Sequence, residues 1–341
     1  MSTIPSNMMF SSGGKAVAIA SARRSVVVIP ENGSGPYQKS QQQVIRIQLS
    51  PALGYLDTHE SFLSFRIKPV GMDLTKPCRM DKSSLSWVKK LTIESSTGSK
   101  LEEIDDYNLL SCMLHEQTGG KEYTETIGTK VDSHGDRASR QAAMAHPDGA
   151  QYNSGFDCSG LLGGETKVLP LPFLQGAVTI SLELAPVDEC FVYTKDATAS
   201  HAEYQVCNLQ YHASVLSMSE EYSAKMSEQV RTSGVDMSFV TYRTHRTNIR
   251  SNDEDLPISQ NAASVRGTYH LLREAGKISS SEADSLSTYS SGDLRSIQWD
   301  MGGQLYPTQP IEMEKDGSTS MFTHNLQTWN MHRNHAIGSK V

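Results

Sequence analysis

Short segments in which apolar and polar residues alternate run through most of the chain, and a period of two residues is typical of half-buried β-strands. The two clearest cases are residues 178–184 and 207–215, with further strand patterns at 44–49, 61–68 and 294–299. Residues 91–94 and 100–104 flank a short polar connection that contains Gly98. Because a glycine in a short connection between two strands is a turn signal, this pair predicts a β-hairpin.

Helical spacing of apolar residues occurs in only three places. These are residues 106–117, residues 219–231 with Ser219 as the expected N-cap, and residues 318–334. Strand-like runs return at 239–242 and 266–272, and the prolines of Tyr306-Pro307 and Gln309-Pro310 predict a turn. Many short strands, polar turns and few helices are typical of antiparallel sandwiches or barrels. We therefore expect a mainly β protein made of two jelly-roll sandwiches with a few short helices.

The length of 341 residues favours two folded units, since single cores rarely grow beyond roughly 250–300 residues. A break at Gly234 divides the chain into a first jelly roll over 43–234 and a second, complete or abbreviated, over 235–341. Residues 1–42 are rich in Ser, Gly and Gln with one apolar burst at 26–29, which predicts an N-terminal arm with a lone strand. Residues 118–166 show little periodicity and predict a long loop outside the core, and residues 276–293 predict a second polar loop.

Charge narrows the range of partners. The formal net charge is -7, so the folded body should not attract a polyanion over its whole surface. Two basic segments remain as candidate contacts with phosphate or a neighbouring subunit. They are Lys15, Arg23 and Arg24 in the arm, and Arg243, His245, Arg246 and Arg250 in the body.

The chain also lacks an apolar stretch near the ~18 residues of a membrane helix, and its short N-terminal apolar run is not typical of a cleaved leader.

Motifs for catalysis or metal binding are weak. The five cysteines are widely spaced without a CxxC pair, which indicates free thiols in a reducing compartment. His332 and His335 form an HxxH without an acidic or thiolate ligand nearby, and neither GxSxG nor a phosphate-binding glycine loop is present. Glu102 and Glu103 are neighbours on a strand, so their side chains should point to opposite faces. We expect neither an enzyme nor a metal or cofactor site, and we expect the tryptophans to be core residues.

The order of elements over about 40–220 resembles the first jelly roll of the double jelly-roll major capsid proteins of double-stranded DNA viruses and virus-like transposons. The small-genome branch, with Polinton-like elements, adintoviruses and virophages, is the part of this family that the chain resembles. The segments that carry the resemblance are Val44-Ile45-Arg46-Ile47, Leu56-Asp57 followed by Ser61-Phe62-Leu63-Ser64-Phe65, the hairpin from Leu91 to Ile104 leading to Tyr107-Asn108-Leu109-Leu110, and Leu169-Pro170-Leu171-Pro172. In the second half, Leu294 to Trp299 running into Leu305 to Ile311 resembles the stretch before the helix of the family's second barrel.

The resemblance implies a homotrimeric, pseudo-hexagonal capsomer of an icosahedral shell, located in the virion after assembly inside the host cell. The implied partners are neighbouring capsomers, minor capsid or penton proteins, and an internal membrane or the genome through the arm, with no small-molecule substrate. The family continues with more strands after the helix expected at 318–334, so either the second barrel is abbreviated or the chain is a fragment. The alternative function is that of a jelly-roll glycan-binding or host-attachment protein. A hydrolase that acts on polysaccharide is a third functional class.

Overall fold

The computed structural model describes residues 11–12, 15–16, 20–118, 135–163, 168–174, 176–234, 237–251, 253–258, 262, 264–290 and 294–312. The chain divides into two compact units. The first comprises Met1–Thr244 together with Ile278–Ser287, and the second comprises His245–Lys277 and Thr288–Val341. Their bounds in the sequence show that the chain leaves the first unit, returns to it for ten residues and leaves again.

Most regular elements are short strands. The strands are β1 (Ser11–Ser12), β2 (Lys15–Ala16), β3 (Ala20–Val28), β4 (Val44–Leu49), β5 (Tyr55–Val70), β6 (Arg79–Met80), β7 (Val88–Ser95), β8 (Lys100–Asp105), β9 (Ala150–Ser154), β10 (Leu169–Pro170), β11 (Val178–Leu184), β12 (Phe191–Val192), β13 (Glu203–Met218), β14 (Ser296–Met301) and β15 (Gln304–Glu312). The α-helices are α1 (Tyr107–Thr118), α4 (Arg137–Met144), α5 (Val187–Cys190) and α6 (Glu220–Thr232). All described strand pairs are antiparallel. The predicted fold class, mainly β with antiparallel jelly-roll sheets and a few short helices, is confirmed.

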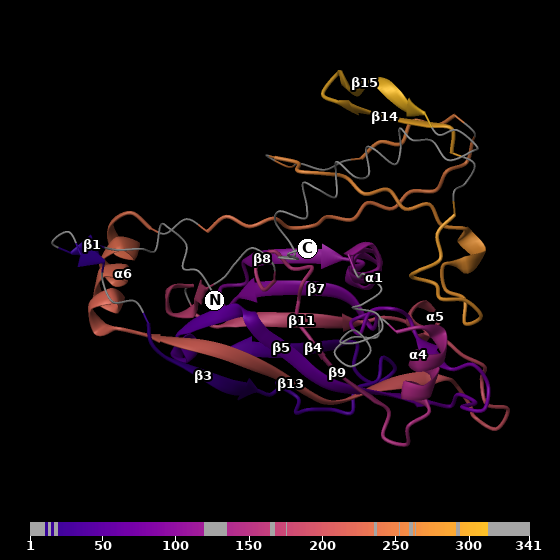
Figure 1. The fold of residues 1–341 in the computed structure, drawn as a ribbon, viewed down its shortest axis with the longest axis horizontal. Coiled ribbons are helices and arrows are strands. Elements are labelled where there is room, and N and C mark those ends of the chain that lie inside the picture. The colour runs from indigo at the N-terminus through magenta and orange to yellow at the C-terminus, as the bar shows by residue number, and fades with distance from the viewer. Residues whose placement is uncertain are drawn as a thin grey trace. The chain divides into compact units, whose positions relative to one another are not determined.

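The first unit is a jelly-roll sandwich (Figure 1). One sheet has the order β10-β5-β13-β3, with β9 also paired to β5, and the other has the order β4-β11-β7-β8. The consecutive strands β3 and β4 therefore lie in different sheets, while β3 pairs with β13 from the far end of the unit. This alternation between two sheets is the wrapping pattern of a jelly roll.

The core lies between the two sheets and follows from the alternation in the sequence. In β4 the residues Ile45, Ile47 and Leu49 are buried while Val44, Arg46 and Gln48 are exposed. In β11 the buried and half-exposed positions alternate over all seven residues. Phe65 and Trp87 meet edge to face across the core, with 5.3 Å between ring centroids. Trp87 is fully buried, as predicted for a core tryptophan. Trp299 is only half-buried on β14, so the prediction is wrong there, and Trp329 lies outside the described residues.

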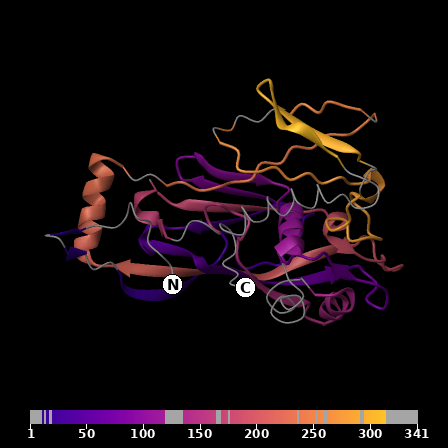
Figure 2. The same cartoon turned by 45° about the horizontal axis from the view of Figure 1, so that its top comes forward.

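The hairpin and two of the three predicted helices form close to their predicted positions. The hairpin joins β7 and β8 through Gly98, which has a positive φ of 80°. Helix α6 begins after Ser219, whose side chain accepts a hydrogen bond from Tyr222 N at 3.2 Å. Figures 1 and 2 show α6 at one end of the sandwich, beyond β13, and α4 and α5 near the opposite end. The helix predicted at 318–334 lies outside the described residues.

The N-terminal segment differs from the arm expected over 1–42. From Ala20 onward it belongs to the sandwich, because β3 pairs with β13 along its length. Tyr37 is also part of the core, with 3% of its surface exposed. The apolar residues 26–29 predicted only the end of this strand. Its first part contains Ala20, Arg23, Arg24 and Ser25, which show no strand pattern in the sequence and are extended because they pair with β13.

The segment 118–166 also differs from the expected loop outside the core. Residues 119–134 lie outside the described part, but α4 and β9 follow them, and β9 pairs with β5 from Ala150 to Ser154. Met144, Tyr152, Phe156, Leu161 and Leu162 are buried in the main core. The placement outside the core is therefore wrong for these five residues. The pairing of β9 with β5 brings part of a segment of weak periodicity into the sandwich.

In the second unit the described residues form one hairpin, β14 with β15. Its turn is Gly302-Gly303, and both glycines have positive φ, 65° and 85°, which glycine adopts most readily. Pro307 and Pro310 lie within β15, so the turn predicted at these prolines is wrong. Residues 239–242 and 266–272 lie outside the described strands, and the range 235–341 for a second jelly roll stays a prediction.

Among the described residues, no helix combines the length and the apolar character that crossing a membrane requires.

Candidate functional site

The segment Ile278–Ser287 is the place where the chain comes back to the first unit, and we call it the returning segment. It carries no strand or helix, yet Asp284, Ser285 and Leu286 are buried. Tyr193 N donates a hydrogen bond to Ser281 O at 2.9 Å, and Ser285 Oγ donates to Asp188 O at 3.4 Å. The polar loop predicted over 276–293 is therefore packed into the first unit at 284–286, because serines, Asp284 and Leu286 all find partners there.

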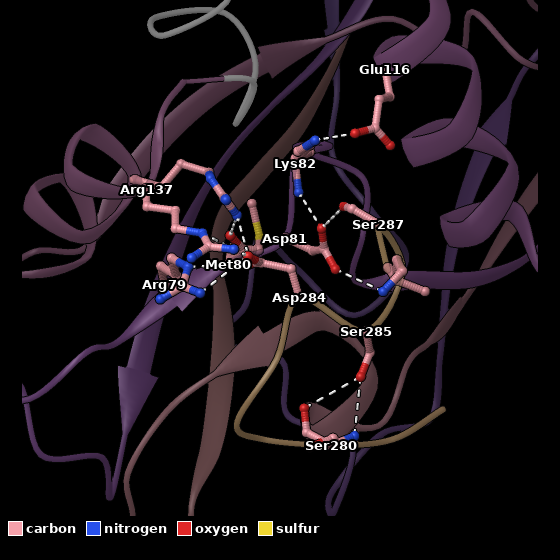
Figure 3. Close-up of polar contacts among 12 residues, drawn as sticks. Arg79, Met80, Asp81, Lys82, Glu116, Arg137, Ser280, Asp284, Ser285 and Ser287 are labelled. Atoms are coloured by element: carbon pink, nitrogen blue, oxygen red, sulfur yellow. Dashed lines mark hydrogen bonds and ion pairs between the residues drawn. The ribbon is translucent and has the colours of Figure 1, made fainter. Parts of the chain in front are cut away.

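Asp284 is the centre of a charge cluster (Figure 3). Arg79 donates from Nε and Nη2 to its two carboxylate oxygens at 3.2 and 3.1 Å, and Arg140 Nη1 donates to Oδ1 at 3.0 Å. The side chains of these three residues are at most 9% exposed. Arg137 approaches the same carboxylate at 3.7 Å, but 80% of its side chain is exposed. Burial acts to raise the pKa of Asp284, but the hydrogen bonds and charges of Arg79 and Arg140 hold it below its ordinary value of 3.8.

Asp81 binds the next two residues of the returning segment. Its Oδ2 accepts from Leu286 N at 2.8 Å, and its Oδ1 accepts from Ser287 Oγ and from Lys82 N. Burial raises the pKa of Asp81, and the negative charge of Asp284 acts in the same direction, while the hydrogen bond from Ser287 opposes the rise. Asp284 within the returning segment and Asp81 outside it thus both fix this segment, and the pKa of Asp284 is lowered while that of Asp81 is raised.

Local sequence places the two arginines of α4. Asp136 is the N-cap, and its carboxylate accepts from Ser139 N at 2.7 Å. Arg137 and Arg140 are three residues apart on this helix and therefore lie on one face, which is the face that meets Asp284. Arg140 Nη1 also donates to Met80 O at 2.6 Å, which fixes α4 to β6.

A second charged cluster lies around Lys89 on β7. Lys89 Nζ is 2.8 and 2.7 Å from the two carboxylate oxygens of Glu189, and 2.9 Å from Asp106 Oδ1. Asn108 Nδ2 also donates to Glu189 at 3.2 Å. These contacts tie α5 and the start of α1 to the sheet that contains β7.

Glu102 and Glu103 have different roles, as their neighbouring positions on a strand predict. Glu102 is 3% exposed and accepts hydrogen bonds from Gly160 N at 2.8 Å, Leu161 N at 3.1 Å and the hydroxyl of Ser159. Glu103 points outward and binds Lys90 and Lys100. Hydrogen bonds from these two lysines lower the pKa of Glu103. Neither geometry brings the two carboxylates together as an acid and base pair.

Metal ligands do not gather in the part of the chain that the structure describes, where no group of three His, Cys, Asp or Glu side chains could hold an ion. His115 Nε2 is 3.9 Å from Asp157 Oδ2, and the neighbouring Glu116 binds Lys82. His332 and His335 lie outside the described residues. Four of the cysteines are buried and Cys207 is half-buried.

The predicted contact residues lie in several places. Arg243, His245, Arg246 and Arg250 are exposed, with Arg243 in the first unit and the other three in the second. Arg23 lies on β3, where Nη2 donates to the buried Asp57 at 2.7 Å, and Arg24 Nη2 donates to Leu53 O at 3.5 Å. Lys15 lies in β2, paired with Ser12. Arg23 thus has a structural partner besides any contact outside the chain.

The sequence analysis missed the cluster of Arg79, Asp81, Arg140 and Asp284. Arg79 and Asp284 are 205 positions apart, so no local spacing joins them. The one available signal is Leu286, a lone apolar residue beside Asp284 in a serine-rich stretch. In chemical terms the cluster orders a segment of backbone, because Arg79 and Arg140 bind the carboxylate of Asp284 and Asp81 accepts hydrogen bonds from Leu286 N and Ser287 Oγ.

The chain was compared with protein families, with curated proteins and with solved structures. No family model matches the chain, and no curated protein matches it. Among solved structures, one that the chain is similar to is a crystal structure of PBCV-1 VP54 fitted into a cryo-EM reconstruction of the virophage Sputnik. The similarity covers 60% of this chain and 44% of the other, at 12% identity and a TM-score of 0.34. The chain therefore spans less than half of that structure, and a likeness at this level carries no argument about function.

Proposed function

We propose that this chain is a structural subunit of an icosahedral virus shell, a double jelly-roll major capsid protein that assembles as a homotrimer. The observation that carries the proposal is the strand order of the first unit, β10-β5-β13-β3 facing β4-β11-β7-β8. The same segments carry the sequence resemblance to capsid proteins. In this proposal residues 235–341 form the second jelly roll, and the chain is not an enzyme.

The buried charges fit a structural role. Asp81, Glu102, Glu189 and Asp284 each accept hydrogen bonds from groups that hold a loop, a helix or the returning segment in place. Carboxylates that serve catalysis need a face open to substrate, whereas these four are buried against structural donors. A rigid sandwich with firmly held loops is the shape of subunit from which large, well-ordered shells are built.

The partners in this proposal are neighbouring capsomers, minor capsid or penton proteins, and an internal membrane or the genome. Lys15, Arg23 and Arg24 near the N-terminus are the candidates for phosphate or membrane contact. Arg243, His245, Arg246 and Arg250 are exposed and are candidates for contact with an acidic neighbouring subunit. The location is the virion, after assembly inside the host cell.

Electron microscopy of the concentrated, purified chain tests the proposal. Hexagonal sheets or closed shells are the expected result. Dispersed particles of monomer size at every concentration would contradict it, and selective binding on a glycan array by that monomer would point to the attachment protein instead.

A further inference from the structure

The hairpin of β14 and β15 has one strongly apolar face. Its strands pair Ile297 with Ile311 and Trp299 with Tyr306. Directly opposite residues share a face of a sheet, and so do residues two positions apart on one strand, which adds Met301 to this set. The opposite face carries the polar residues that lie between these positions on β14. We call the apolar side the hairpin face.

The hairpin face is covered only in part. Met301 and Tyr306 are each 46% exposed. Trp299 is half-buried, and its indole N–H donates a hydrogen bond to His270 Nε2 at 2.8 Å. Among the described residues no third strand pairs with this hairpin. Because a two-stranded sheet is marginally stable by itself in water, the hairpin face needs something to pack against it.

The residues that follow the hairpin in the chain have the pattern of such a partner. In the helix expected over 318–334, Phe322, Leu326 and Trp329 recur at intervals of four and three residues, which places them on one side. The connection 313–317 contains glutamate, lysine, aspartate and glycine, a composition typical of a turn. Elements joined by so short a connection are usually neighbours in space.

The dimensions of the two surfaces match. The apolar positions on β14 span four strand steps, about 13 Å, and those of the expected helix span seven helical steps, about 10 Å. Because β15 ends at Glu312, away from the turn of the hairpin, a helix that begins shortly afterwards runs back along it. Eight helical steps, about 12 Å, bring Leu326 level with Trp299, which is three strand steps or about 10 Å from the start of β14.

We infer that residues 318–334 form a helix that covers the hairpin face of the same chain, with Phe322, Leu326 and Trp329 in the contact. The hairpin face is then an internal docking surface of the second unit and not a contact with another subunit. The inference goes beyond the capsid proposal and does not depend on it, since it concerns a single chain.

Hydroxyl-radical labelling of the full chain, read by mass spectrometry, tests the contact. Leu326→Asp places a charge in the middle of an apolar contact, so the labelling of Met301 and Tyr306 should rise. Leu305 lies on the opposite face of the hairpin at 53% exposed, and its labelling should not change. Trp87, in the core of the first unit, should stay protected in the variant and thus report that this unit is folded.

His324→Asp is the matched control. Residues two positions apart in a helix point about 200° away from each other, so His324 faces away from the hairpin and this variant should be labelled as the unchanged chain is. In a strand the two positions would share a face, and both variants would raise the labelling. Equal labelling of Met301 in Leu326→Asp and His324→Asp would overturn the inference.

A change on the hairpin gives the reciprocal test. Tyr306→Asp should raise the labelling of Leu326 and Trp329, whereas Leu305→Asp, on the opposite face, should not. The absence of a rise in Tyr306→Asp would contradict the contact even if Leu326→Asp failed to fold. Labelling of Met301 that falls as the unchanged chain is concentrated would show that a second copy covers the hairpin face, and would also overturn the inference.

Discussion

Asp284 accepts two hydrogen bonds from Arg79, at 3.2 and 3.1 Å, although the two residues are 205 positions apart in the chain. This pair, together with Arg140, fixes the returning segment Ile278–Ser287 within the first unit. Leu286 is the one large apolar side chain of the segment that is fully buried. The place of this segment in the fold therefore depends on charge.

Replacing Asp284 with asparagine should destabilise the first unit. The change leaves the guanidinium groups of Arg79 and Arg140 buried without their counter-charge, and breaking a buried pair in this way costs about 3–5 kcal/mol. Denaturant unfolding followed by tryptophan fluorescence measures the change in the free energy of unfolding. Arg137→Ala is the matched control, because this arginine contacts the same carboxylate from a largely exposed position and should cost at most about 1 kcal/mol. An equal loss in both variants would contradict the account.

The effect of Asp284→Asn should depend on pH. The pKa of Asp284 is lowered in the folded state, so its contribution to stability is present above pH 3.8 and is lost as the pH falls through the lowered value. The difference in unfolding free energy between the unchanged chain and Asp284→Asn should therefore shrink below about pH 4. Asp81 contributes in the opposite direction, because burial raises its pKa and the charge of Asp284 adds to the rise. Its pKa is therefore raised less in Asp284→Asn, which makes the expected shrinkage smaller without reversing it. A difference that stays constant from pH 7 to pH 3 would show that Asp284 does not act as a carboxylate.

The neighbours Glu102 and Glu103 should respond differently to the same substitution. Glu102→Gln removes the charge that accepts from Gly160 N and Leu161 N, and it should lower the free energy of unfolding by about 1–3 kcal/mol. Glu103→Gln breaks surface ion pairs with Lys90 and Lys100 and should cost about 1 kcal/mol or less. Thermal unfolding of the two variants in parallel checks the order, and a larger loss for Glu103→Gln would refute it.

Gly160 should not tolerate a side chain. A Cβ atom at this position would lie 1.9 Å from Val240 O and 2.9 Å from Phe239, whose side chain packs against the core. Gly160→Ala should therefore push residues 239–240 away and cost about 1–3 kcal/mol, as overpacking does. Gly276→Ala is the control, since a Cβ there meets open space. Faster proteolysis near residue 240 in Gly160→Ala is the expected second readout, and unchanged protection would argue against this packing.

The sequence pattern predicted those parts of the fold in which local periodicity and burial agree. Residues 178–184 alternate because β11 lies in the middle of its sheet with one face on the core. Ser219 caps a helix and Gly98 lies in a turn, and both roles depend only on the residue type and its immediate neighbours. These features need no knowledge of distant partners.

Features that depend on distant partners could not be predicted in this way. The strand Ala20–Val28 includes Arg23 and Arg24, and its conformation follows from pairing with β13 almost two hundred residues later. Phe156 and Leu161 are buried because Glu102 holds the turn beside them. The cluster at Asp284 joins β6, α4 and the returning segment, and no spacing along the chain connects the three.

The mass of the purified chain in solution tests the central claim most directly. Native mass spectrometry, supported by light scattering, measures how many copies associate. The account predicts a stable particle with three times the 37.5 kDa of one chain. A chain that stays monomeric from micromolar to assembly concentrations would contradict the proposal that it is a capsid subunit.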